Sequence, residues 1–142
     1  MKLMDILLVE DNPDHAMLTK KVLEDNKVVN KIYLVEDGEE ALDFIYHREK
    51  YSNGNAPRPG LILLDVKLPK IDGFAVLKQL KNDSEYKNIP IVMLTTSSRD
   101  EEIAKGYADG ANSYVTKPIR FDEFTEKIKG IGIYWGLICS NY

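Results

Sequence analysis

Cysteine and long apolar runs are scarce in this chain, and each shortage excludes a class of protein. The single cysteine, Cys139, has no partner for an internal disulfide, so a reduced, cytoplasmic setting is expected. No apolar stretch approaches the roughly 20 residues that cross a bilayer. The apolar stretch at 6–9 is too short for a signal peptide and leads into acidic residues. We therefore predict no direct membrane insertion.

Positive charge and length are limited as well. The chain has 142 residues, with 19 Lys and Arg against 23 Asp and Glu, and a net charge of −4. A negative net charge disfavours non-specific electrostatic binding to nucleic acid, so no nucleic-acid partner is expected. The length allows one domain with one sizeable core. A single domain over 1–142 is therefore predicted.

Four short apolar runs each end on a residue that can handle a phosphoryl group. The runs at 6–9, 61–64, 91–94 and 114–116 lead to Glu10 with Asp11, to Asp65, to Thr95 and to Lys117. Continuous apolar runs are typical of parallel strands buried between helices. In such sheets ligands bind beyond the carboxyl ends of the strands, where side chains distant in sequence meet. Three carboxylates, a hydroxyl and an ammonium gathered there suit a divalent cation and a phosphoryl group.

The apolar runs alternate with helical patterns, which predicts βαβ units and an α/β fold. The first helix is expected to begin after Asn12 as N-cap, with Leu18 and Val22 on its buried face. The fourth helix is expected to be capped by Ser97 or Ser98. Five strands, each followed by a helix, are predicted at 5–9, 31–35, 61–64, 91–94 and 113–116.

Two further segments have distinctive compositions. The stretch at 51–60 is rich in Asn, Gly and Pro, which predicts a loop. The closing segment at 121–142 begins as a helix, but glycines at 130, 132 and 136 each cost a helix roughly 1 kcal/mol relative to alanine. Its end is therefore expected either to fray or to bind a partner. The apolar stripe of this helix is predicted to comprise Phe124, Ile128, Ile131, Trp135 and Ile138.

Each site residue also has a plain structural interpretation. Glu10 and Asp11 alone would be solvated acids near a helix N-terminus, and Tyr114 alone would be a packed aromatic. Asp65 is harder to explain in that way, because a carboxylate at the end of a buried strand is costly unless a cation or donor satisfies it. Lys117 precedes a proline, which restricts its backbone. The inference of a site therefore depends on the whole set of residues.

Four segments of the chain resemble the receiver domain of two-component response regulators. They are LLVED at 7–11, LILLDVKLPKIDG at 61–73, PIVMLTT at 90–96 and GANSYVTKP at 110–118. The intervals agree as well, since Thr95 lies 95 − 65 = 30 positions and Lys117 lies 117 − 65 = 52 positions after Asp65. The resemblance extends over about 5–131. It implies a flavodoxin-like, doubly wound (βα)5 fold with a five-stranded parallel sheet in the strand order 2-1-3-4-5.

The resemblance implies a phosphoryl acceptor and a metal site. Asp65 would be the phosphorylation site, and Glu10, Asp11, Asp65 and the backbone carbonyl of Lys67 would hold Mg²⁺, a hard cation that prefers oxygen ligands. Many receivers have two aspartates where this chain has Glu10 and Asp11, an exchange that keeps the charge. At Lys67 many receivers carry a neutral or acidic side chain. Our hypothesis is that the Lys67 ammonium alters the lifetime of the phosphorylated state.

The resemblance implies a switch and a partner as well. Lys117 would supply positive charge to the phosphoryl group, because phosphoryl transfer rests mainly on positioning and charge neutralisation. Thr95 would then bind the phosphoryl group and Tyr114 would turn inward behind it. The phosphoryl donor would be a phosphohistidine on a sensor histidine kinase. The protein would be a signalling phosphoacceptor and no enzyme beyond its own phosphorylation and dephosphorylation.

A surface insertion at about 47–60 narrows the resemblance. Together with the aromatic, glycine-containing closing segment at 121–142, it is similar to single-domain receivers that partner phytochrome-type histidine kinases. The alternative interpretation is a tolerated surface loop, since extra loop length costs little free energy.

The signal is expected to leave by contact with a downstream protein target or a phosphotransfer protein. The exchange surface that receivers use comprises the fourth helix, the strand at 113–116 and the last helix. Phe124, Tyr134 and Trp135 are expected on or near it, and these surplus apolar groups predict a homodimer through that face.

Two other functions are open to the same residues. A Mg²⁺-dependent phosphohydrolase with an aspartyl nucleophile usually has a second aspartate two positions later, where this chain has Lys67. A flavodoxin-like module for a flavin or nucleotide would need a phosphate-binding loop after the first strand, where Glu10 and Asp11 would repel phosphate. The phosphoacceptor switch therefore ranks first.

Overall fold

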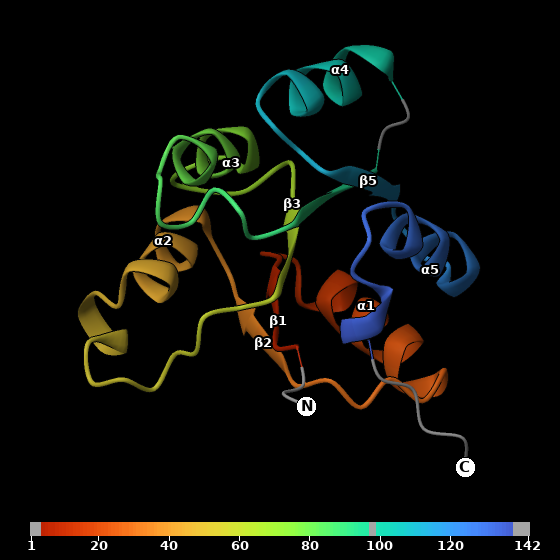
Figure 1. Ribbon diagram of the computed structural model, residues 1–142, viewed down its shortest axis with the longest axis horizontal. Helices are drawn as coiled ribbons and strands as arrows, with labels where there is room; N and C mark the ends of the chain where they lie inside the picture. Colours follow the sequence, from red (N-terminus) through yellow and green to blue (C-terminus); the bar gives the residue numbers. More distant parts are fainter. Residues whose placement is uncertain (1–3, 97–98, 138–142) are drawn as a thin grey trace.

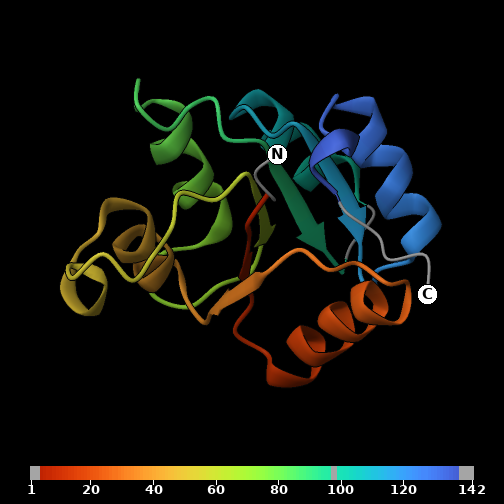
Figure 2. The same cartoon turned by 60° about the horizontal axis from the view of Figure 1, so that its bottom comes forward.

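The computed structural model describes residues 4–96 and 99–137. Five parallel strands form one sheet in the order β2-β1-β3-β4-β5 (Figures 1 and 2). The strands are β1 (Ile6–Val9), β2 (Ile32–Val35), β3 (Leu61–Asp65), β4 (Ile91–Thr95) and β5 (Ser113–Thr116). The α-helices are α1 (Pro13–Asp25), α2 (Gly38–Tyr46), α3 (Gly73–Lys81), α4 (Asp100–Ala108) and α5 (Phe121–Gly130), with 3-10 helices η1 (Glu49–Tyr51) and η2 (Tyr134–Gly136). The predicted fold class and strand order are confirmed.

Helices cover both faces of the sheet, so the core has two halves (Figure 1). Side chains alternate along a strand. Ile6 and Leu8 of β1 therefore pack in the half beneath α1 and α5, whereas Leu7 and Val9 pack in the half beneath α2 and α3. Because the sheet is covered on both faces, the carboxyl ends of its strands are where polar side chains gather.

The buried face of α1 differs from the prediction. The helix begins after Asn12, as expected, and it buries Ala16, Thr19 and Leu23. Of the two predicted residues, Val22 is partly buried and packs against the core as expected, but Leu18 is 50% exposed. Successive residues turn by about 100° around a helix, so a shift of one position moves a side chain well off the packed stripe. Packing of Ala16 and Leu23 in the half of the core that holds Ile6 and Leu8 selects the observed rotation of the helix.

Two helix ends also differ from the prediction. Arg99 stands at the N-cap position of α4, and Ser97 and Ser98, the predicted caps, lie outside the described residues. Three acids in the first turn of α4 supply the negative charge that favours a helix N-terminus. The helix α5 ends at Gly130, so the apolar stripe does not continue on one helix to Ile138, which lies outside the described residues. Gly132 has a φ of 80°, a conformation that no α-helix continues.

The segment at 47–60 packs closely on α2. The ring of Tyr51 meets Phe44 edge-on at 5.0 Å between centroids, and its hydroxyl donates to Glu40 at 2.8 Å. Lys50 adds an ion pair to Glu40 at 2.7 Å. Ala56 is buried in the core. These contacts favour a structural role for the segment over that of a loosely attached surface loop.

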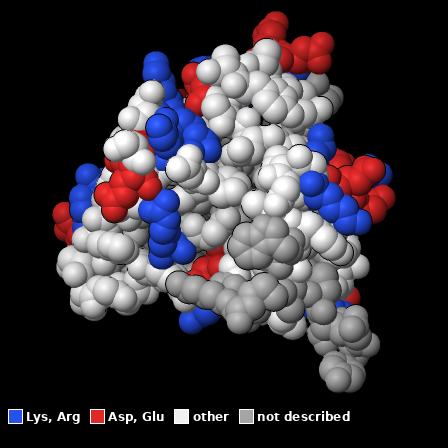
Figure 3. Space-filling model, viewed as in Figure 1, with Lys and Arg blue, Asp and Glu red and all other residues white. Residues whose placement is uncertain are grey.

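Among the described residues, no helix is both long and apolar enough to cross a membrane. On the face shown in Figure 3, acidic and basic side chains are intermixed around a broad uncharged area.

Candidate functional site

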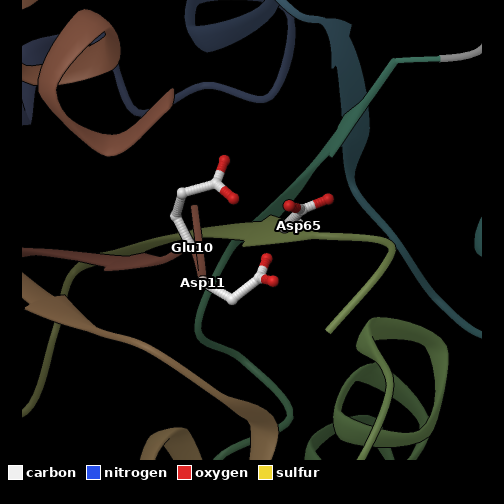
Figure 4. Close-up of side chains that lie close together, drawn as sticks. All are labelled: Glu10, Asp11 and Asp65. Carbon is white, nitrogen blue, oxygen red and sulfur yellow. The ribbon is translucent and has the colours of Figure 1, made fainter. Parts of the chain in front are cut away.

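Three carboxylates meet where β1 and β3 end. Glu10 and Asp11 follow β1 directly, and Asp65 is the last residue of β3. The two strands are neighbours, with Val9 opposite Leu64, so their carboxyl ends lie side by side. Each acid offers an oxygen, and these oxygens lie within 4.8 Å of one another (Figure 4). The sequence predicted this grouping, and the structure brings the three acids together.

Burial makes this grouping costly without positive charge. Glu10 is only 1% exposed, Asp65 is buried, and Asp11 is exposed. The backbone N–H of Asn12 donates to Glu10 at 3.3 Å, and the backbone N–H of Lys67 donates to Asp65 at 3.2 Å. Two backbone donors cannot neutralise buried carboxylates, so a cation is required nearby.

The ammonium of Lys117 supplies part of that charge. Lys117 follows β5, and its Nζ lies 2.7 Å from Glu10 Oε1 and 2.9 Å from Asp65 Oδ2. The side chain of Lys117 is 6% exposed. Its backbone N–H donates to the carbonyl of Thr95 at 2.7 Å. This bond attaches the backbone of Lys117 to the end of β4. The Lys117–Pro118 peptide bond is cis.

The electrostatics of the site are dominated by burial and by the surplus of acids. Burial, with Asp65 beside it, raises the pKa of Glu10 to about 7, although Lys117 opposes the shift. Burial lowers the pKa of Lys117, but the hydrogen bonds and charges of Glu10 and Asp65 outweigh burial, and the net shift is upward. Three carboxylates and one ammonium carry a formal charge of 1 − 3 = −2. A hard divalent cation with oxygen ligands fits this donor set.

Thr95 is the last residue of β4 and lies near the acids. The hydrogen bond described for its side chain is made with α4 and not with these acids. Its hydroxyl donates to Glu102 of α4 at 3.2 Å. Tyr114, the second residue of β5, is half-buried. Its ring meets Tyr107 of α4 edge-on at 6.0 Å, and Lys127 Nζ lies 4.3 Å from its centroid. The Thr95 hydroxyl and the Tyr114 ring thus both contact α4. Thr95 and Tyr114 line one pocket together with Glu102.

The structure adds two side chains that the sequence analysis missed. Glu102 accepts from Thr95, and His15 Nδ1 lies 3.1 Å from Lys117 Nζ. His15 lies in the first turn of α1, which begins directly after the β1 end, and that proximity could have indicated its position beside the strand ends. The side chain of Lys67 is exposed and lines an open hollow with Asp11.

The fold and this group of residues define a flavodoxin-like α/β domain with an acidic site at the carboxyl ends of its strands. The chain belongs to the response regulator receiver domain family, whose model matches residues 6–129. The predicted resemblance is confirmed, and the protein is a receiver of two-component signalling. Neither the phosphohydrolase nor the flavin or nucleotide module is favoured.

Two of its relatives are regulators of similar length. The probable methanogenesis regulatory protein FilR2 of Methanothrix harundinacea is 39% identical, over 92% of this chain and 82% of that protein. Response regulator Rcp1 of Synechocystis is 36% identical, over 92% of this chain and 87% of that protein. The structure of the bacteriophytochrome response regulator AtBRR has a TM-score of 0.89 and 38% identity, with each chain covered fully.

One solved relative bears on the metal. A structure of the Mn²⁺-bound form of Rcp1 has a TM-score of 0.75 and 36% identity, over 93% of this chain and 94% of that chain. The acid cluster of Glu10, Asp11 and Asp65 has the hard oxygen donors that such a divalent cation binds.

Proposed function

We propose that Asp65 is the phosphoryl acceptor of this receiver. The observation that carries the proposal is the position of its carboxylate at the end of β3, where Lys117 Nζ lies 2.9 Å from one oxygen and two other acids face the same space. The Lys117 ammonium is thereby placed to neutralise charge on an incoming phosphoryl group.

The transfer would exchange one bond to phosphorus for another. A carboxylate oxygen of Asp65 attacks the phosphorus of a phosphohistidine, the P–N bond breaks, and the electron pair returns to the departing imidazole. Lys117 stays beside Asp65 and donates hydrogen bonds toward the transferred oxygens. The product is an aspartyl phosphate on Asp65.

The metal ligands would be Glu10, Asp11, Asp65 and the backbone carbonyl of Lys67, and the ion would be Mg²⁺. When bound, the ion supplies positive charge to the carboxylates and the phosphoryl oxygens. The formal charge of −2 in the cluster and the burial of Glu10 and Asp65 support a dication at this position.

Thr95 and Tyr114 would form the switch. A phosphoryl group on Asp65 competes for the Thr95 hydroxyl, which now donates to Glu102. Movement of Thr95 toward Asp65 would remove that contact from α4 and open the space into which Tyr114 turns. The shared pocket of Thr95, Glu102 and Tyr114 supports this coupling.

The phosphoryl donor would be a sensor histidine kinase of the phytochrome type, in a cytoplasmic setting. Two similar proteins of known structure support that link, since AtBRR is a bacteriophytochrome response regulator and RcpA is a cyanobacterial phytochrome response regulator. Output would pass to a downstream protein target or a phosphotransfer protein, and α4, β5 and α5 would present the face for a homodimer. The domain would comprise the whole of 1–142, including the insertion at 47–60.

Phosphorylation by a small donor tests the central claim. The protein is incubated with Mg²⁺ and acetyl phosphate, and its intact mass is measured. We expect a gain of one phosphoryl group that is absent in Asp65→Asn and present in Asp25→Asn, which changes an exposed acid of α1. Catalytic release of phosphate without a stable adduct would instead indicate a phosphohydrolase. A phosphoryl gain that persists in Asp65→Asn would reject the assignment.

A further inference from the structure

His15 contacts the ammonium at the centre of the site, although it lies outside the four segments on which the sequence resemblance rests. Its backbone is held at the start of α1, because the Asn12 side chain accepts from the backbone N–H of His15 at 3.2 Å and of Asp14 at 2.9 Å. Its ring reaches Lys117, with 3.1 Å between Nδ1 and Nζ. The imidazole side chain is 40% exposed, so one side of it faces solvent.

The chemistry of the two groups determines the direction of this hydrogen bond. A lysine ammonium has three N–H donors and no acceptor. His15 Nδ1 must therefore accept, which places the ring proton on Nε2. Glu10 Oε1 lies 3.9 Å from Nδ1, beyond hydrogen-bonding distance. The Lys117 contact thus predicts the Nε2–H tautomer for His15.

His15 completes the set of acceptors around Lys117. The three donors of the ammonium face Glu10 at 2.7 Å, Asp65 at 2.9 Å and His15 at 3.1 Å. Glu10 and Asp65 are also the residues that would bind the metal and the phosphoryl group. When they do, their contacts with Lys117 must change, whereas the neutral imidazole can keep its own.

We propose that His15 is a positioning residue that holds the Lys117 ammonium toward Asp65 during phosphorylation. The proposal rests on the proposed function, in which Asp65 accepts the phosphoryl group and Lys117 neutralises it. While its Nδ1 accepts from the ammonium, that nitrogen is not available to a metal, so the imidazole orients Lys117 without taking the place of an acid ligand. Its effect should fall on the rate of phosphorylation and leave the fold unchanged, because the side chain is partly exposed.

The test compares two replacements of His15. In His15→Leu the acceptor is lost, and in His15→Asn the amide oxygen lies near the position of Nδ1. The first-order rate constant for phosphorylation is measured at saturating Mg²⁺ and acetyl phosphate, a donor too small to contact the exposed surface of α1. We expect the rate constant to fall about fivefold in His15→Leu, the effect of one net hydrogen bond, and to recover at least half of that loss in His15→Asn. Met17→Leu, at a 65% exposed position of the same helix, should match the wild type.

The hydrogen bond itself is measured separately. At pH 8.5, ¹⁵N NMR of the His15 ring should show the proton on Nε2, with the Nδ1 resonance shifting in Lys117→Met. This readout requires no phosphorylation, so it separates the two claims. A wild type that gains no phosphate would reject the proposed function, and the inference with it. If the wild type is phosphorylated, three outcomes would each overturn the inference and leave the proposed function standing. They are equal rates in His15→Leu and wild type, equally slow rates in His15→Leu and His15→Asn, and a proton on Nδ1.

Discussion

At the scale of single residues, charge imbalance in a buried space governs the site. Glu10 and Asp65 are buried beside one ammonium, and burial with the neighbouring Asp65 raises the pKa of Glu10 to about 7. In the unfolded chain the same carboxyl titrates near its ordinary value of 4.5. Between these two values the folded, metal-free protein therefore binds the extra proton, and its free energy of unfolding falls as pH rises.

Glu10→Gln should remove this pH-dependent loss. At pH 8 in EDTA the variant should be more stable than the wild type by on the order of 3 kcal/mol, because glutamine needs no deprotonation in a buried, acid-rich space. Below pH 4.5 the difference should vanish, since Glu10 is then protonated in both states. Urea unfolding at the two pH values measures both differences. Glu24→Gln on the exposed surface of α1 is the control, and equal stabilities of Glu10→Gln and wild type at pH 8 would contradict the expectation.

Lys67 should lengthen the life of the phosphorylated state. Its exposed ammonium lines the same hollow as Asp11, where it can attract the phosphoryl oxygens and hinder the approach of water. An exposed ion pair is worth a fraction of a kcal/mol to about 1 kcal/mol, so Lys67→Ala should lose its phosphate about two- to fivefold faster. Decay of the phosphorylated mass after removal of acetyl phosphate gives the rate. An unchanged rate would reject the hypothesis, and Lys87→Ala, at an exposed position between α3 and β4, serves as control.

At the scale of elements, close packing positions the loop between β3 and α3 that follows the acceptor. A Cβ on Gly38 of α2 would lie 1.9 Å from the carbonyl oxygen of Ile71. Lys70 reinforces the same junction, with its Nζ 3.6 Å from Asp37 and 3.7 Å from Glu39. The start of α2 therefore supports the loop from which Lys67 offers its backbone carbonyl.

Gly38→Ala should displace that loop. The added methyl group forces backbone apart, so we expect a loss of about 1–3 kcal/mol in the free energy of unfolding and weaker Mg²⁺ binding. Gly130→Ala at the end of α5 has nothing within 4 Å of the new Cβ. It should instead stabilise the protein by about 0.5–1 kcal/mol through helix propensity. Urea titrations measure the stability of both variants, and Mg²⁺ titrations measure their metal affinity. An unaltered Mg²⁺ affinity in Gly38→Ala would show that the loop does not depend on the contact between Gly38 and Ile71.

At the scale of the whole molecule, the segment after α5 returns to the amino ends of β1 and β2. Asn30 is buried, and its side-chain amide donates to the carbonyls of Met4 and Gly136 at 2.7 Å each. Leu137 is buried in the half of the core that holds Ile6 and Leu8 of β1. Residues 131–137 are thus packed on the domain, which argues against fraying over this range; partner binding stays a prediction, and residues 138–142 lie outside the described part of the chain.

Removal of the Asn30 amide should loosen both ends of the chain together. Asn30→Ala leaves two buried carbonyls without this donor, at a cost of about 1–3 kcal/mol. Hydrogen exchange should accelerate in 131–137 and near Met4, while Asn88→Ala, at an exposed position, should change neither stability nor exchange. Unchanged exchange in 131–137 would mean that other contacts suffice to hold the segment.

The homodimer proposed for the face of α4, β5 and α5 is also a property of the whole molecule. Phe124 is buried in the core and cannot contribute to this face, contrary to the prediction, whereas Tyr107 is 48% exposed on α4. We expect sedimentation to show a dimer of the phosphorylated protein that Tyr107→Asp dissociates and Val29→Asp, beside β2 at the opposite edge of the sheet, does not. Monomers alone, with and without phosphorylation, would remove the dimer from the proposal.

The sequence by itself determined the α/β class, the receiver resemblance and the grouping of the acids. These follow from local pattern, because continuous apolar runs predict buried parallel strands, and residues at the ends of such strands share one edge. Glu10, Asp11 and Asp65 are consecutive with β1 and β3, so their meeting needed no knowledge of side-chain packing.

Only the tertiary structure decided which further side chains join the site and which apolar residues are buried. His15 and Lys117 are 102 positions apart, and their contact depends on how α1 lies against the end of β5. Whether Leu18 or Thr19 faces the core depends on a helix rotation that packing alone selects. The contact of Thr95 with Glu102 likewise depends on where α4 lies over β4. Periodicity assigns a residue to a helix or a strand, but contacts between elements set the rotation and partner of each side chain.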